Sequence, residues 1–198
     1  MNIKQLESLY QELAFPQLIP QDKLNIEYVN KWRNDAEKAL RIGRHVSIHD
    51  IKNRDFKVYH WRKSSVSGVW FVAIDGKTVD FLYAYQSLRL NEVHRASEAL
   101  AYSFNPEQVA GVIGKVFFDH LLPNLKFVVT DSLYTPDGHR WFLAEYNEAF
   151  GRGYKVYAID LAKNTIVRID KKKWSDLQPL YWGKDEAHQK YRFAIELP

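Results

Sequence analysis

The stretch NPEQVAGVIGKVFFDHLLPNLKFVVTD, residues 105–131, decides the fold because a loop, a helix and a strand follow one another in it. From Val109 onward, apolar residues recur at positions i, i+3, i+4 and i+7, which predicts a helix that ends at the following proline. Residues 125–131 form a near-continuous apolar run, which is typical of a strand buried on both faces. Gly111 and Gly114 interrupt the first helical turns, where each costs about 1 kcal/mol relative to alanine.

Glycines at the start of a helix have two interpretations. They can allow the helix to pack tightly on a sheet, or they can allow a large anion to approach the backbone. The first N–H groups of a helix have no intrahelical acceptor and lie at the positive end of its dipole, so amides between Gly111 and Gly114 would suit a pyrophosphate. Lys115 or Lys126 would add positive charge. The segment lacks the Lys-Ser/Thr pair of a P-loop and the third glycine of a dinucleotide fingerprint.

The composition is that of a globular protein. The chain has 198 residues, of which 46% are hydrophobic and 26% charged, which predicts one domain over residues 1–198. The absence of cysteine excludes disulfides and thiolate metal sites. Without a long apolar run or a charged-then-apolar leader, neither a membrane helix nor a signal peptide is expected, and the predicted location is the cytoplasm. The net charge of +4 favours anionic partners.

Helical and β patterns occupy different parts of the chain. Helices are expected at residues 3–14 and about 28–42, which gives a helical N-terminal extension over residues 1–50. Strands are expected in runs of β-branched and aromatic residues, at 56–63, 68–75, 78–88, 95–104, 125–131, 154–161, 165–170 and, as an edge strand, 191–197. Asp75-Gly76 indicates a two-residue hairpin. A further helix is expected to begin with Thr135 as N-cap and Pro136. The predicted class is α+β, with a mixed, largely antiparallel central sheet flanked by helices.

This order of elements resembles the GNAT superfamily of acyl-CoA-dependent N-acyltransferases. The residues that carry the resemblance are the Gln-Val-Ala-Gly loop at 108–111, the segment FFDHLLPNLKFVVTDS that follows it, and the Gly-Tyr pair at 153–154. The longer segment FFDHLLPNLKFVVTDSLYTPDGHRWF is similar to a GNAT-like branch found in bacteriophages, to which DNA-modifying Mom-type enzymes are related in fold. The resemblance covers residues 56–161, and leaves residues 1–50 and the C-terminal strands and tail at 162–198 outside it.

The resemblance implies an acyl-CoA site, with acetyl-CoA as the simplest ligand. Its pantetheine arm would enter a V-shaped opening between strands 95–104 and 125–131. The pyrophosphate would lie on a loop made of Gln108, Gly111, Val112, Gly114 and Lys115. The family pattern Gln/Arg-x-x-Gly-x-Gly/Ala has its last small residue one place before Gly114, where this chain has isoleucine.

Acyl transfer to an amine needs a base, a donor to the thioester oxygen and an acid for the departing thiolate. Glu98, on the splayed strand, is the candidate base; the alternative is a solvent-facing glutamate. Tyr102 on the same strand is a candidate substrate contact, with packing as the alternative. Asp131 and Ser132 follow a buried strand, where ligands of open α/β sheets bind, and capping is the other role considered for them.

The residue that protonates the departing thiolate in the family has no direct counterpart in this sequence. The tyrosine that the family places four residues before the Gly-aromatic pair is Ala149 here. Tyr146, one helical turn earlier, and Tyr134 are the candidate substitutes. Proton transfer assisted by the substrate, or loss of the chemistry, is the alternative.

Two functions of different classes therefore remain. The first is an acyl-CoA-dependent N-acyltransferase whose acceptor is an amine on a macromolecule or a nucleobase. The second is a catalytically inactive, GNAT-derived phage protein that binds a host protein or nucleic acid. No metal site is expected, because His45 and His49 have no evident third ligand.

Overall fold

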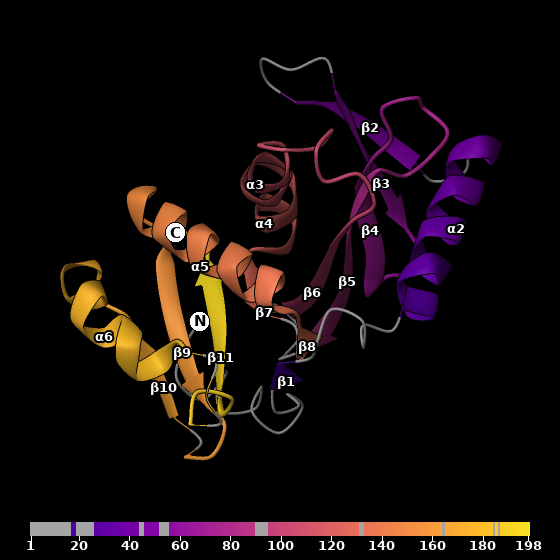
Figure 1. Cartoon of the computed structure of the whole chain (residues 1–198). Helices are drawn as coiled ribbons and strands as arrows, with labels where there is room; N and C mark the ends of the chain where they lie inside the picture. Colours follow the sequence, from indigo (N-terminus) through magenta and orange to yellow (C-terminus); the bar gives the residue numbers. More distant parts are fainter. Residues whose placement is uncertain are drawn as a thin grey trace. The chain divides into compact units, whose positions relative to one another are not determined.

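The computed structural model describes residues 17–18, 26–43, 46–51, 56–89, 95–130, 133–163, 165–183, 185 and 187–198 (Figure 1). The helix expected at residues 3–14 lies outside these ranges. The chain divides into two compact units, which are described separately. The meander unit comprises Asn25–Ser87 and Ala99–Asn124, and the C-terminal unit comprises Met1–Leu24, Leu88–Glu98 and Leu125–Pro198.

The meander unit is built on antiparallel strands in the order β6-β5-β4-β3-β2. Its described elements are α2 (Ile26–Ile42), β2 (Val46–Asp50), β3 (Lys57–Arg62), β4 (Ser67–Val72), β5 (Phe81–Arg89), β6 (Arg95–Ser103), α3 (Ile113–Val116), η2 (Phe117–Leu121) and α4 (Leu122–Leu125). Of these, β5, β6 and α4 extend past the bounds of the unit. Strand β2 was not expected from the sequence. None of its residues is fully buried, and it pairs with β3 along one side only.

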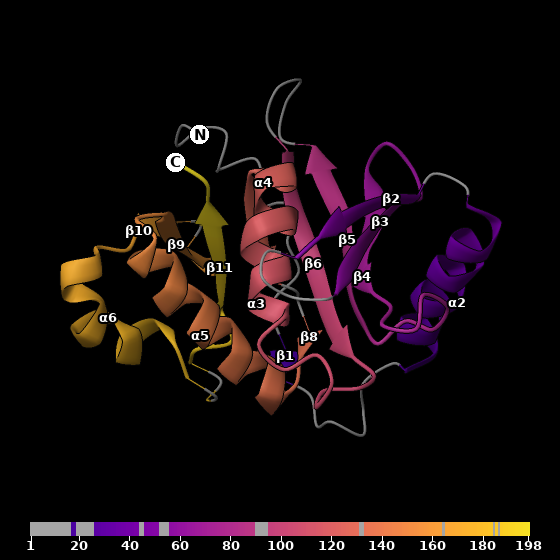
Figure 2. The ribbon, with the colours of Figure 1, turned by 90° about the horizontal axis from the view of Figure 1, so that it is seen from above.

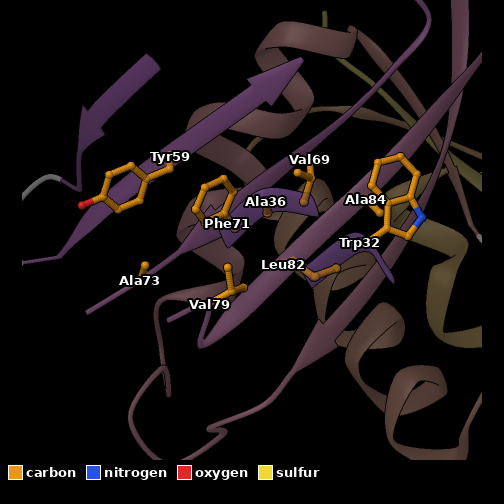
Figure 3. Close-up of a cluster of buried hydrophobic side chains, with 9 residues drawn as sticks. All are labelled: Trp32, Ala36, Tyr59, Val69, Phe71, Ala73, Val79, Leu82 and Ala84. Carbon is orange, nitrogen blue, oxygen red and sulfur yellow. The ribbon is translucent and has the colours of Figure 1, made fainter. Parts of the chain in front are cut away.

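One face of this sheet packs against α2 (Figure 3). Trp32 and Ala36 of the helix meet residues that point to the same side of neighbouring strands, namely Tyr59, Val69, Phe71, Leu82 and Ala84. The alternation of side chains along a strand explains this selection, since every second residue faces the helix. Burial of each large apolar side chain here is worth about 1.5–3 kcal/mol. The expected helix at 28–42 and the expected strands 56–63 and 68–75 are thus confirmed, with small shifts at their ends.

The opposite face of the sheet packs against the helix formed by α3, η2 and α4. The ring of Tyr83 lies 6.0 Å from that of Phe117, and its hydroxyl donates a hydrogen bond to the carbonyl of Ile113 (3.3 Å). Figures 1 and 2 show α2 and α3 on opposite sides of β4 and β5. The sheet of the meander unit is therefore covered on both faces.

The turn at Asp75 and Gly76 is present, but it does not make a two-residue hairpin. β4 ends at Val72 and β5 begins at Phe81, so the connection is longer than the sequence predicted. Gly76 has a φ of 69°, and the Asp75 carboxylate accepts hydrogen bonds from the two amides that follow Gly76 (2.7 Å each). The Asp-Gly signal thus reports the local turn and does not fix how far the strands extend.

The C-terminal unit contains antiparallel strands in the order β10-β9-β11-β7. Its elements are β1 (Gln17–Leu18), β7 (Phe127–Thr130), β8 (Leu133–Tyr134), α5 (Pro136–Gly151), β9 (Lys155–Asp160), β10 (Thr165–Arg168), η3 (Lys171–Lys173), α6 (Trp174–Tyr181) and β11 (Tyr191–Glu196). β1 and β8 pair separately, in parallel. The α+β class predicted from the sequence is confirmed in both units.

The last strand was expected at an edge, and that prediction is wrong. β11 lies between β7 and β9, with Ala194 paired to Val129 on one side and to Tyr157 on the other. Five of its six residues are buried, since both of its edges are paired within the sheet. The strand that closes the chain therefore lies inside the sheet of this unit.

In the described part of this unit, the α-helices are α5 and α6. The Thr135 side chain caps α5 by accepting a hydrogen bond from the Gly138 amide (3.2 Å), as the sequence predicted. α6 was not expected. It follows the lysine run Lys171–Lys173, which forms an exposed turn, and it is fixed to α5 by a hydrogen bond from the Trp174 indole to the Asn147 side chain (2.8 Å). Figure 2 shows α5 beside β9.

Candidate functional site

The glycine loop, residues 105–112, precedes α3 in the meander unit. The helix begins at Ile113, later than the apolar spacing predicted, so Gly111 belongs to the loop. Gly111 is exposed and has a φ of 72°, a left-handed conformation that costs other residues about 1–2 kcal/mol. This backbone requirement explains the first glycine. Gly114 alone lies in the first helical turn.

The buried Asp80 holds the start of this loop. Its side chain accepts hydrogen bonds from the Asn105 side chain (2.5 Å) and the Ile74 amide (2.8 Å). Its carbonyl accepts from the amides of Phe104 (2.8 Å) and Asn105 (3.2 Å). The Val109 amide in turn donates to the carbonyl of Asn105 (3.2 Å). The loop is therefore fixed to the β4–β5 connection by a chain of hydrogen bonds.

The first amides of the helix lie directly behind Gly111. The Val112 amide donates to the carbonyl of Val109 (3.0 Å), which completes the turn. Within the described ranges, no hydrogen-bond acceptor is found for the amides of Ile113 and Gly114, and no side chain caps the helix. Such amides can bind an anion, and the exposed glycine places no side chain in front of them.

The five residues predicted to bind a cofactor lie together on this loop and turn. Gln108 and Gly111 are exposed, and Gly114 and Lys115 are half-buried. Val112 is fully buried, so its side chain belongs to the core and only its backbone is available to the loop. A pyrophosphate is compatible with the backbone groups and with the charge of Lys115. The features that make it compatible are the conformation of Gly111, the amides of Ile113 and Gly114, and the charge of Lys115.

The helix changes pitch after one turn. η2 (Phe117–Leu121) is π-helical and lies between two α-helical turns. A π turn accommodates an inserted residue and is often found at functional sites. It carries His120, which the sequence predicted only as part of the apolar helix face.

The residues predicted on the splayed strand have different surroundings. Glu98 lies in β6, and its side chain is outside the described part of the chain. Tyr102 is half-buried, with its ring 4.8 Å from that of Phe104. Both rings pack against the α2 side of the sheet, and the guanidinium of Arg33 lies 4.2 Å from the Phe104 ring. Packing accounts for Tyr102 in this arrangement.

The residues predicted in the C-terminal unit are not gathered into one described cluster. Asp131 and Ser132 lie outside the described residues, and Tyr134 is described only as part of the backbone of β8. Tyr146 has 1% of its surface exposed, with its ring 5.4 Å from Trp182 and 5.3 Å from Phe193. This environment accounts for Tyr146 by packing and gives no route to solvent for proton transfer.

A histidine and tryptophan cluster on the α3 side of the meander sheet was missed from the sequence. His60 stacks on Trp70 with ring centroids 4.1 Å apart, and its Nε2 lies 3.0 Å from the hydroxyl of Tyr85. His49 of β2 and His120 of η2 lie 5.2 and 5.5 Å from Trp70 and 5.5 Å from each other. The two strands were expected from the sequence, but only the strand register brings His60 and Trp70 opposite each other.

Burial controls the protonation of this cluster. It lowers the pKa of His60 to about 4, and the charges of Arg62 and His49 act in the same direction. Burial also lowers the pKa of His120, with a further contribution from His49. The pKa of Tyr85 is raised by burial, against the opposing effect of Arg62. At neutral pH, His60 and Tyr85 are therefore an uncharged, hydrogen-bonded pair, suited to a structural role.

Two buried charged residues of the C-terminal unit also had no sequence signal. Burial and the neighbouring Glu148 raise the pKa of Glu145 on α5 to about 8. Arg192 on β11 is fully buried and donates a hydrogen bond to the carbonyl of Thr130, at the end of β7. Buried ionisable groups of this kind are found at functional sites and in structural networks alike.

No protein-family model, curated protein or solved structure matches the chain. Among the described residues, no group of three or more histidine, aspartate or glutamate side chains is arranged to hold a metal ion. In the same part of the chain, no helix is long and apolar enough to cross a membrane.

Proposed function

We propose that the chain is an acyl-CoA-binding protein of the N-acyltransferase type, with an amine on a macromolecule or a nucleobase as acceptor. The single observation that carries the proposal is the exposed, left-handed Gly111 directly before the first amides of α3. An exposed glycine with this backbone leaves room for a phosphate where a side chain would obstruct it. Tight packing of the helix on the sheet does not explain a glycine at this position, because Gly111 is exposed to solvent.

The order of the elements supports the same proposal. The strands β2 to β6 form the meander, the glycine loop follows β6, and the helix from Ile113 leads into the buried β7. α5 comes next, and Gly153 precedes β9 with a φ of 77°. This is the order of elements that the GNAT resemblance implies over residues 56–161.

The chemistry proposed is nucleophilic acyl transfer. Acyl-CoA would supply an activated thioester. The chain would bind its pyrophosphate at the amides of Ile113 and Gly114, with Lys115 providing charge, and would orient the acceptor amine. Glu98 remains the proposed group that removes the amine proton. Because Ala149 is buried and cannot donate a proton, the departing thiolate would take its proton from the ammonium of the acceptor or from water.

Isothermal titration calorimetry of the full chain tests the binding step. We expect acetyl-CoA to bind, and acetyl-pantetheine, which lacks the pyrophosphate, to bind at least tenfold more weakly. Equal affinity for the two ligands would show that the loop does not bind the pyrophosphate. No heat of binding at millimolar acetyl-CoA would overturn the proposal.

A second function, an inactive interaction protein derived from the same fold, is favoured by the environment of Tyr146. Its ring is enclosed by Trp182 and Phe193, and the family's tyrosine position is Ala149. Release of free thiol from acetyl-CoA in the presence of polyamines, peptides and nucleic acids separates the two functions. Binding without thiol release above the uncatalysed rate would support the inactive protein.

A further inference from the structure

A groove between α2 and the end of β3 lies within the meander unit and contains none of the residues assigned above to acyl-CoA. Its volume is about 610 Å³, which is within the usual range of small-molecule sites. Asp35, Lys38 and Ile42 line it from the helix, and Trp61, Arg62 and Lys63 line it from the strand end and the turn that follows. We call it the α2 groove.

The groove exists because of the spacing of residues on the helix. Asp35, Lys38 and Ile42 lie three and four residues apart, which puts them on one side of α2. Ala39, which lies between them and also lines the groove, has a small side chain that does not fill it. Ile42 is 61% exposed, so its side chain is accessible at the edge of the groove.

The groove has an excess of positive charge. It contains Lys38, Arg62 and Lys63 against a single carboxylate, that of Asp35. Asp35 pairs with Lys63 at 2.8 Å, so the charge of Lys38 remains in excess. The charge of Arg62 acts on His60 and Tyr85, which lie on the α3 side of the sheet, and is not part of this excess. An anionic ligand is therefore favoured over a neutral or cationic one.

Aromatic surface lies next to these charges. The Lys63 ammonium is 4.7 Å from the centroid of the Trp32 ring and 5.9 Å from that of Trp61. The ion pair with Asp35 and these ring contacts hold the ammonium in one place. The half-buried Trp61 packs on the core and also lines the groove. A planar group such as a nucleobase gains affinity by stacking on an indole.

From this combination we infer that the α2 groove binds a nucleotide, with the phosphate near Lys38 and Lys63 and the base against Trp61 and Ile42. The nucleotide is either free or one unit of a single strand, because both present the same anion and the same planar base. An acidic peptide would satisfy the charges but would leave the aromatic and apolar wall without a planar partner.

Fluorescence anisotropy with a labelled oligothymidylate, and calorimetry with AMP, test this inference at low and moderate salt. We expect Lys38→Glu combined with Lys63→Glu to weaken binding at least tenfold. Lys31→Glu combined with Lys57→Glu makes the same change of net charge at exposed positions outside the groove lining. This control should weaken binding less than threefold. Trp61→Phe should weaken it by an intermediate factor, and Trp141→Phe should leave it unchanged.

Comparison of the ligands distinguishes a single strand from a free nucleotide, and both from an acidic peptide. Tight binding of the oligonucleotide with weak binding of AMP indicates a single strand, and equal binding per site indicates a free nucleotide. An equal loss of affinity in the groove variant and in its control would overturn the inference. The absence of binding at low salt would also overturn it. Binding of oligoglutamate as tight as that of the oligonucleotide would overturn it in favour of an acidic peptide.

CoA itself carries a nucleotide, so the groove must be distinguished from the glycine loop. The groove variant should retain the tenfold preference for acetyl-CoA over acetyl-pantetheine if the loop binds the pyrophosphate. Gly111→Ala should reduce that preference and leave oligonucleotide binding unchanged. The two experiments therefore test the nucleotide site in the groove and the acyl-CoA site at the glycine loop independently.

Discussion

The imidazole of His60 lies parallel to the indole of Trp70, with an interplanar angle of 7°. The two residues are directly opposite each other on β3 and β4, and His60 is hydrogen-bonded to Tyr85 on β5. His49 and His120 also lie close to the Trp70 ring. The stacked pair thus links three strands and the π-helical segment, and it does so in its neutral form.

Acid should destabilise the protein through this histidine. The pKa of His60 is about 4 in the folded protein, below its unfolded value, so the unfolded chain binds the proton more readily. Stability is then fully present above about pH 6.5 and is lost as the pH falls toward 4. After allowance for solvent screening, we expect a loss of about 1–2 kcal/mol. Urea titrations between pH 7 and 4 measure it, and His60→Asn should show a smaller loss.

A rise in pH should destabilise the protein through Glu145. Its pKa of about 8 is raised above the unfolded value, so stability is fully present below about pH 4.5 and declines as the pH rises to 8. Glu145→Gln should remove this decline and stabilise the protein at pH 8 by about 3–5 kcal/mol. Glu27→Gln is the matched control, because that residue is exposed on α2 and belongs to the other unit. An unchanged pH profile in the Glu145 variant would contradict the assignment.

Gly111 and Gly43 offer a matched pair of substitutions. Both lie in the meander unit with φ values of 72° and 61°, so alanine should cost each about 1–2 kcal/mol of stability. Gly43 follows α2 and has no heavy atom within 4 Å of an added Cβ. Only Gly111→Ala should also weaken acetyl-CoA binding, at least fivefold by calorimetry. Equal effects of the two variants on affinity would show that the loop is not the binding site.

Removal of the Asp80 carboxylate should release the glycine loop. Asp80→Ala leaves the Ile74 amide and the Asn105 side chain without their acceptor, which we expect to destabilise the protein by about 2–3 kcal/mol. Asn105→Ala removes one of these bonds and should cost less. A double-mutant cycle measures the coupling between the two residues, and full additivity would show that their hydrogen bond is unimportant.

Local patterns predicted most of the elements. The runs of β-branched and aromatic residues at 56–63 and 68–75 indicated β3 and β4, and the capping signals at Thr135 and Pro136 indicated the start of α5. Such signals are local, because they depend on residues within one or two turns of the chain.

Long-range arrangement could not be predicted in the same way. Nothing in residues 191–197 distinguishes an edge strand from one inserted between β7 and β9, since pairing on both sides depends on distant partners. For the same reason, the stacking of His60 on Trp70 requires the β3–β4 register. The candidate site shows both cases. The sequence identified the glycine loop, and the structure showed that Gly111 is required by its backbone conformation and precedes the helix.

The π-helical segment Phe117–Leu121 has a consequence for deletions in this region. A π turn contains about one residue more than an α turn, so the loss of one residue here would regularise the helix without rotating its remaining part. Leu121 and Leu122, which are fully buried, would keep their direction toward the core. Shortening the chain by a single residue at this point should therefore be less damaging than the same deletion in a regular helix such as α5, where the residues that follow would be rotated by about 100°.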